Sequence, residues 1–123
     1  MALAGFSLIW LPFEDTEITY PVLLAAGWCA WLLARFFVQS AGSTGLVRGA
    51  LAGAVAGLAV APLAVFLMVL KGGLHAHGFP DFALLQMRST LATTPWWGLA
   101  GLSSGLLAGW VKSRIEQNEK QPH

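Results

Sequence analysis

Apolar residues gather in three long runs, separated by shorter polar or glycine-rich stretches. The runs cover residues 20–38, 46–70 and 95–111, and charged side chains inside them are confined to Arg35 and Arg48. Since a helix needs about 20 mostly apolar residues to cross a bilayer, the pattern predicts three transmembrane helices. With their flanking residues, the predicted segments are 19–41, 44–71 and 94–112. The expected fold class is an all-α integral membrane protein.

Glycines recur every four residues in the second and third runs, which places them on one face of a helix. Each glycine costs a water-exposed helix about 1 kcal/mol relative to alanine, but in lipid it lets two backbones approach closely. The stripes therefore predict a glycine zipper in which the second and third helices pack as an antiparallel hairpin. Spacing alone also allows them to pack against another chain. The glycines assigned to helix packing are Gly45, Gly49, Gly53, Gly57, Gly101, Gly105 and Gly109.

Three further segments lie outside the predicted spans. Residues 1–18 are apolar as far as Phe13 and then acidic, and their apolar part is too short to cross a bilayer. We expect this segment to lie on the membrane surface or against a partner, with Trp10, Leu11 and Phe13 as docking residues. Residues 72–93 predict a loop with a short interfacial helix over 81–93. Residues 113–123 predict a polar tail.

Basic residues predict the orientation of the chain. Five of them belong to one end of the predicted spans: Arg35, Arg48, Lys112, Arg114 and Lys120. Lys71 and Arg88 belong to the other end. Because basic loops stay on the cytoplasmic side, we expect the N-terminus outside and the C-terminus on the cytoplasmic side. The membrane expected is a bacterial inner membrane or a thylakoid-type membrane.

Composition agrees with an embedded protein. Of 123 residues, 56% are hydrophobic and 11% are charged, whereas soluble domains carry about 25% charged residues. The net charge of +1 offers no footprint for nucleic acid. The expected partners are the lipid bilayer and other membrane-protein subunits. A lone cysteine, Cys29, excludes an internal disulfide and a cysteine-based metal site.

Chemistry-bearing side chains concentrate in one loop, which contains His75 and His77. Neutral imidazole can ligate a metal, haem iron or a pigment, but a catalytic zinc needs three protein ligands. We favour the interpretation that these histidines belong to an interfacial loop. No carboxylate lies inside a predicted span, so no acid–base pair is available there. No catalytic residue, metal site or cofactor is assigned.

These features predict a small non-catalytic accessory subunit that stabilises or assembles a larger membrane complex, with respiratory and photosynthetic complexes as the first hosts to consider. The first alternative is a homo-oligomeric transporter or channel whose glycine stripes pack protomers around a pore. The second is a protein that binds metal, haem or pigment through the loop with His75 and His77.

Overall fold

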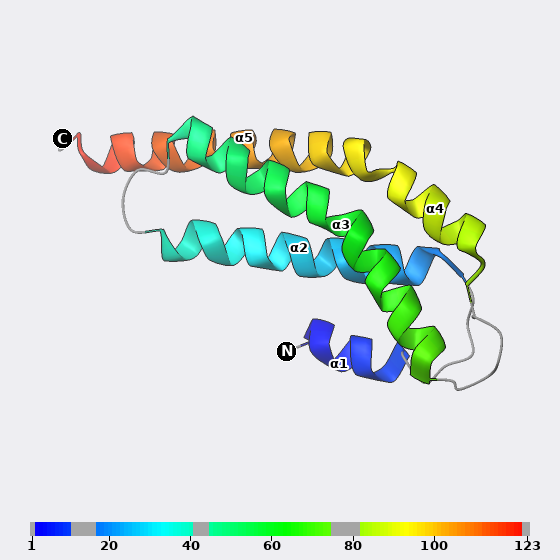
Figure 1. Ribbon diagram of the computed structural model, residues 1–123. Helices are drawn as coiled ribbons and strands as arrows, with labels where there is room; N and C mark the ends of the chain where they lie inside the picture. Colours follow the sequence, from blue (N-terminus) through cyan, green and yellow to red (C-terminus); the bar gives the residue numbers. More distant parts are fainter. Residues whose placement is uncertain (1, 11–16, 41–44, 75–81, 122–123) are drawn as a thin grey trace.

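The computed structural model describes residues 2–10, 17–40, 45–74 and 82–121. Within these residues the chain is helical, and none of them forms a strand. The helices, shown in Figure 1, are α1 (Ala2–Trp10), α2 (Thr19–Gln39), α3 (Leu46–Leu74), α4 (Leu84–Ala92) and α5 (Thr94–Glu119).

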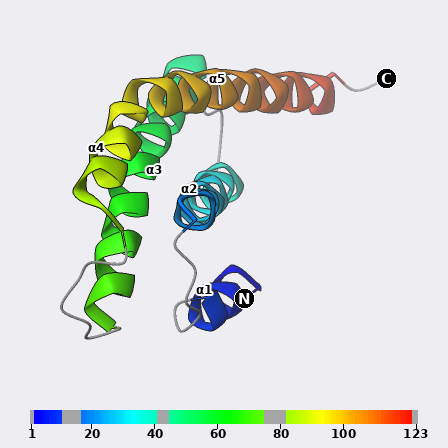
Figure 2. The same ribbon diagram turned by 90° about the vertical axis from the view of Figure 1, so that its right-hand side faces the viewer.

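Helix α3 is the centre of the arrangement. It packs along α5 on one side and against α2 on another, and α4 contacts its C-terminal half. Helix α2 lies between α1 and the pair formed by α3 and α5, as the two views in Figures 1 and 2 agree. The chain therefore builds a small helical unit around α3, with α1 on its outer side.

Two of these helices are long and apolar enough to cross a membrane. The most apolar stretch of α2 has a mean hydropathy of 1.7, and that of α3 has 2.4. Only 22% of the α2 stretch and 39% of the α3 stretch are buried inside the chain. Most of each apolar stretch is therefore not covered by the rest of the described chain. The span predicted at 94–112 lies within α5, which is long but less apolar, and its crossing of the bilayer stays a prediction.

Several boundaries differ from those expected. Residues 2–10, expected only as an apolar surface segment, form α1. The second span was expected to end at Lys71, but α3 continues through Gly72 and Gly73 to Leu74, and α5 continues through most of the expected tail to Glu119. The reason in α5 is that residues 113–119 contain neither glycine nor proline, so nothing in the sequence stops the helix. The short helix expected over 81–93 is described as α4, from Leu84.

The buried apolar side chains form two clusters between α2 and α3. The first joins Leu24 to Met68 and to Phe82, which precedes α4. The second consists of small or medium side chains from both helices: Ala25, Cys29, Val60 and Ala64. Because small side chains allow close approach, α2 and α3 are tightly packed along this part of their length.

Helix α4 turns the chain from α3 back to α5. Its start is stabilised by Gln86, whose Oε1 accepts a hydrogen bond of 2.8 Å from the backbone N–H of Ala83. Met87 packs against the Leu24–Met68–Phe82 cluster, and Thr90 is buried. Leu84 and Leu85 face outward, so α4 presents apolar side chains on its outer surface.

Candidate functional site

Glycines of α3 and α5 bring the backbones of these two helices into direct contact. A Cβ built on Gly53 would overlap the backbone oxygen of Gly101 and lie 2.8 Å from the Cα of Gly105. A Cβ built on Gly49 would lie 2.7 Å from the backbone oxygen of Gly105. Atoms at ordinary van der Waals contact are about 3.5–4.0 Å apart. The absence of side chains on these residues is therefore what allows the two backbones to meet.

The order of these contacts gives the direction of the two helices. Gly49 lies against Gly105, Gly53 against Gly101 and Gly105, and Gly57 against Gly101 and the backbone of Trp97. Residue numbers rise along α3 as they fall along α5, so the pair is antiparallel.

Two of the glycines assigned to packing behave differently. A Cβ on Gly109 would lie 3.6 Å from the Cα of Leu46, which is ordinary contact. A Cβ on Gly45 would meet nothing within 4 Å. The contact between α3 and α5 therefore does not require Gly45 to lack a side chain, and the assignment of Gly45 to helix packing stays a prediction.

Most of the outer surface of the unit is apolar. Large hydrophobic side chains remain exposed on every described helix, including Val55 on α3 at 68% and Leu107 on α5 at 63%. Single exposed hydrophobic residues are normal on soluble proteins, but contiguous apolar patches mark contact with a partner or a membrane. The exposed apolar side chains of this unit therefore include many on α2, α3 and α5.

Helix α1 packs on α2 of the same chain. The side chain of Leu3 lies against Gly27, where a built Cβ would be 3.0 Å from Leu3 Cδ2. Phe6, Leu8 and Ile9 remain exposed, at 50%, 71% and 62%. Of the expected docking residues, Trp10 ends α1 but its side chain is outside the described part, and Leu11 and Phe13 lie outside the described residues.

Basic side chains collect where α2 ends, α3 begins and α5 passes. Lys112 Nζ donates hydrogen bonds to the backbone oxygens of Phe37, at 2.9 Å, and Ser40, at 2.7 Å. The guanidinium of Arg114 lies 5.3 Å from the ring centroid of Trp110. Arg35 has the same relation to Trp31, at 5.1 Å. This end of the unit, which we call the basic end, therefore carries cations stacked on aromatic rings.

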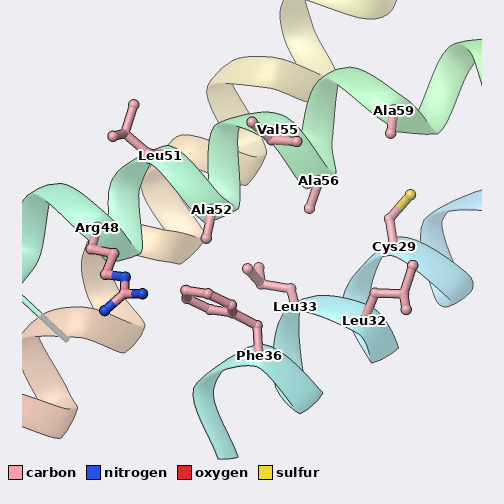
Figure 3. Close-up of a pocket in the computed structure, with 10 residues that line it drawn as sticks. All are labelled: Cys29, Leu32, Leu33, Phe36, Arg48, Leu51, Ala52, Val55, Ala56 and Ala59. Atoms are coloured by element: carbon pink, nitrogen blue, oxygen red, sulfur yellow. The ribbon is translucent and has the colours of Figure 1, made fainter. Parts of the chain in front are cut away.

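A groove of about 510 Å³ opens between α2 and the N-terminal half of α3 (Figure 3). Its α2 wall includes Leu33 and Phe36, and its α3 wall includes Ala52 and Ala56. Arg48 closes the groove at the basic end, with its guanidinium carbon 6.0 Å from the ring centroid of Phe36. The groove is thus lined by apolar side chains, with a cation at one end.

The loop with His75 and His77 lies outside the described residues, so the structure does not place these side chains. Among the residues that are described, no group of three or more His, Cys, Asp or Glu side chains could hold a metal ion. Ser103 and Ser104 hydrogen-bond to their own helix, to the backbone oxygens of Leu99 and Ala100.

No protein-family model, curated protein or solved structure matches this chain.

Two contacts of the basic end were not predicted from the sequence. From the sequence, Lys112 and Arg48 were assigned only to one end of the predicted spans. The partners of both residues come from the end of α2. Lys112 contacts Ser40, which is far from it in the sequence, and Arg48 contacts Phe36. The signal available in the sequence was their common assignment to one end of the spans.

Proposed function

We propose that this chain is a small, non-catalytic integral-membrane subunit that stabilises or assembles a larger membrane complex. The observation that carries the proposal is the contrast between the inside and the outside of the unit. The inside is closed by glycine contacts and small side chains, whereas the outside leaves large apolar residues uncovered on α2, α3 and α5. A unit of this kind can fill a space between larger helices.

The glycine contacts also favour this proposal over a ring of identical chains. That alternative uses the glycine stripes to pack protomers around a pore. In the structure Gly49, Gly53 and Gly57 are buried against α5 of the same chain. The stripes are occupied within the chain, so protomers would have to meet through other surfaces.

The proposed topology has three spans: α2, α3 and residues 94–112 of α5. The basic end would face the cytoplasmic side, because five of the seven lysines and arginines belong to the basic end. The N-terminus would then face the outer side. The proposed location is a bacterial inner membrane or a thylakoid-type membrane. Respiratory and photosynthetic complexes are the first hosts to test, by analogy with the small subunits that such complexes contain.

The test is purification of the tagged full chain from its native membranes in a mild detergent, followed by identification of co-purifying proteins. Resistance of the chain to alkaline extraction of the membranes establishes integration. We expect a constant set of other membrane subunits in a fixed ratio. Recovery of identical chains alone would support the oligomeric alternative, and recovery of a bound metal or chromophore would support the ligand-binding one.

A further inference from the structure

We propose that the groove between α2 and α3 binds one acyl chain of an anionic phospholipid, whose phosphate group pairs with Arg48. This inference rests on the proposed membrane location, but not on the role as a subunit. It begins from the shape of the groove, whose volume of about 510 Å³ lies within the range of about 300–1,000 Å³ typical of small-ligand sites.

The walls of the groove suit a hydrocarbon chain. Alanines at positions 52, 56 and 59 on α3 face leucines and Phe36 on α2, and the groove is open along one side (Figure 3). Because these alanines are small, the groove stays unfilled by the protein itself. In a bilayer such a space is filled by lipid, since an empty apolar cavity forfeits van der Waals contacts on every wall.

Arg48 supplies the charge that selects the lipid. It is the one charged residue of the ten that line the groove, and it lies in the first turn of α3, at the basic end. Arg48 is exposed, and within the described residues its guanidinium lies beside an aromatic ring rather than a carboxylate. A guanidinium matches a phosphate with two parallel hydrogen bonds, and basic pockets between transmembrane helices bind anionic headgroups.

Phe36 positions the guanidinium for this contact. Its ring lies beneath the Arg48 side chain, at 6.0 Å from the guanidinium carbon, on the helix opposite. A guanidinium within about 6 Å of a ring centroid is attracted to the ring face, so Phe36 helps to hold Arg48 at this end of the groove. The apolar groove and the cation therefore lie in the order that a phospholipid requires. The headgroup would lie at the end of α2, and the acyl chain would extend along the groove toward Cys29.

The experiment is native mass spectrometry of the full chain, released from detergent after addition of equal amounts of phosphatidylglycerol and phosphatidylcholine. We expect wild type to retain one phosphatidylglycerol in preference. In the variant Arg48→Gln the retention of phosphatidylglycerol should fall about fivefold, because one basic residue contributes about that much to binding at a membrane surface. Arg48→Lys should keep part of it. Ala52→Phe, which fills the groove, should lower retention of both lipids.

Two variants serve as matched controls. Arg114→Gln removes another arginine stacked on an aromatic ring at the same end, outside the groove. Leu107→Phe enlarges an exposed side chain of α5. Both should retain lipid as wild type does, and circular dichroism should show all variants equally helical.

Equal retention of the two lipids by wild type, or unchanged retention by both Arg48→Gln and Ala52→Phe, would overturn the inference. Displacement of lipid by a second copy or by another subunit's helix in the groove would overturn it as well. Membrane extraction separates this failure from that of the proposed function. A chain that is integrated but shows no lipid preference contradicts only the groove assignment, whereas a chain that is not integrated contradicts both.

Discussion

The side chain of Lys112 on α5 donates a hydrogen bond of 2.7 Å to the backbone oxygen of Ser40, the residue that follows α2. A second bond from the same Nζ, 2.9 Å long, reaches the backbone oxygen of Phe37. Carbonyl groups at the end of a helix lack intrahelical partners and carry partial negative charge, so a lysine there stabilises the helix. Lys112 therefore links the C-terminal end of α2 to the C-terminal part of α5.

We predict that Lys112→Met lowers the free energy of unfolding in detergent by about 1–3 kcal/mol, because charge-assisted hydrogen bonds to helix-end carbonyls are lost. The measurement is a denaturation curve followed by circular dichroism. Lys120→Met is the matched control, since Lys120 is exposed and follows the last residue of α5. A Lys112 variant as stable as the Lys120 variant would show that the capping contact contributes nothing.

Adding one methyl group at the glycine contact should weaken the hairpin. We predict that Gly53→Ala and Gly101→Ala each cost about 1–3 kcal/mol, because an added Cβ meets backbone that cannot move aside. Gly45→Ala should change stability by less than about 0.5 kcal/mol, since nothing lies within 4 Å of its Cβ position. Thermal unfolding in detergent compares the three. Equal stability of all three variants would contradict the close approach of α3 and α5.

Orientation can be tested with single cysteines at two exposed described positions. In a Cys29→Ala background we place a cysteine at Ser89 on α4 or at Gln117 near the end of α5. An impermeant thiol reagent added to intact cells should label position 89 and spare position 117, because the proposed topology places the basic end on the cytoplasmic side. The opposite pattern would mean that something other than the chain's basic residues sets its topology.

The N-terminal segment should matter more for assembly than the histidine loop. Deletion of residues 2–13 removes α1, which packs on α2 through Leu3 and leaves Phe6, Leu8 and Ile9 exposed. Burying one such side chain against a partner is worth about 1.5–3 kcal/mol, so we predict that the deletion releases co-purifying subunits.

The comparison variant for that deletion is His75→Ala with His77→Ala, which should retain the subunits. Loss of partners or of a chromophore in the histidine variant alone, with the deletion harmless, would instead favour a ligand site in the loop.

Hydrophobic patterning predicts the two most apolar helices and their approximate ends. The segments expected at 19–41 and 44–71 correspond to Thr19–Gln39 and Leu46–Leu74. The prediction works because an apolar run of about 20 residues with few charges is typical of a transmembrane helix. It fails for α1, whose nine residues are too few for periodicity to separate a helix from another apolar segment. It fails also at the end of α5, where polar helix formers extend the helix past the apolar run.

The candidate site could be predicted only in part. A spacing of four places Gly49, Gly53 and Gly57 on one face, and in the structure this face lies against α5. The groove and the hydrogen bonds of Lys112 to the end of α2 could not be derived from the sequence. Both depend on how α2 crosses α3 and α5, which brings Arg48 and Lys112 to their partners. Such a crossing depends on the packing of all three helices together, and residue spacing within one helix does not specify it.

The most direct test of the account is the mass of the particle that contains this chain after mild solubilisation of its native membranes, determined on a native gel with identification of the chains present. The account predicts a particle much heavier than the 13.1 kDa chain, containing this chain with a constant set of other membrane subunits. Migration as a lone chain or a ring of identical chains, or recovery in the soluble fraction, would contradict it.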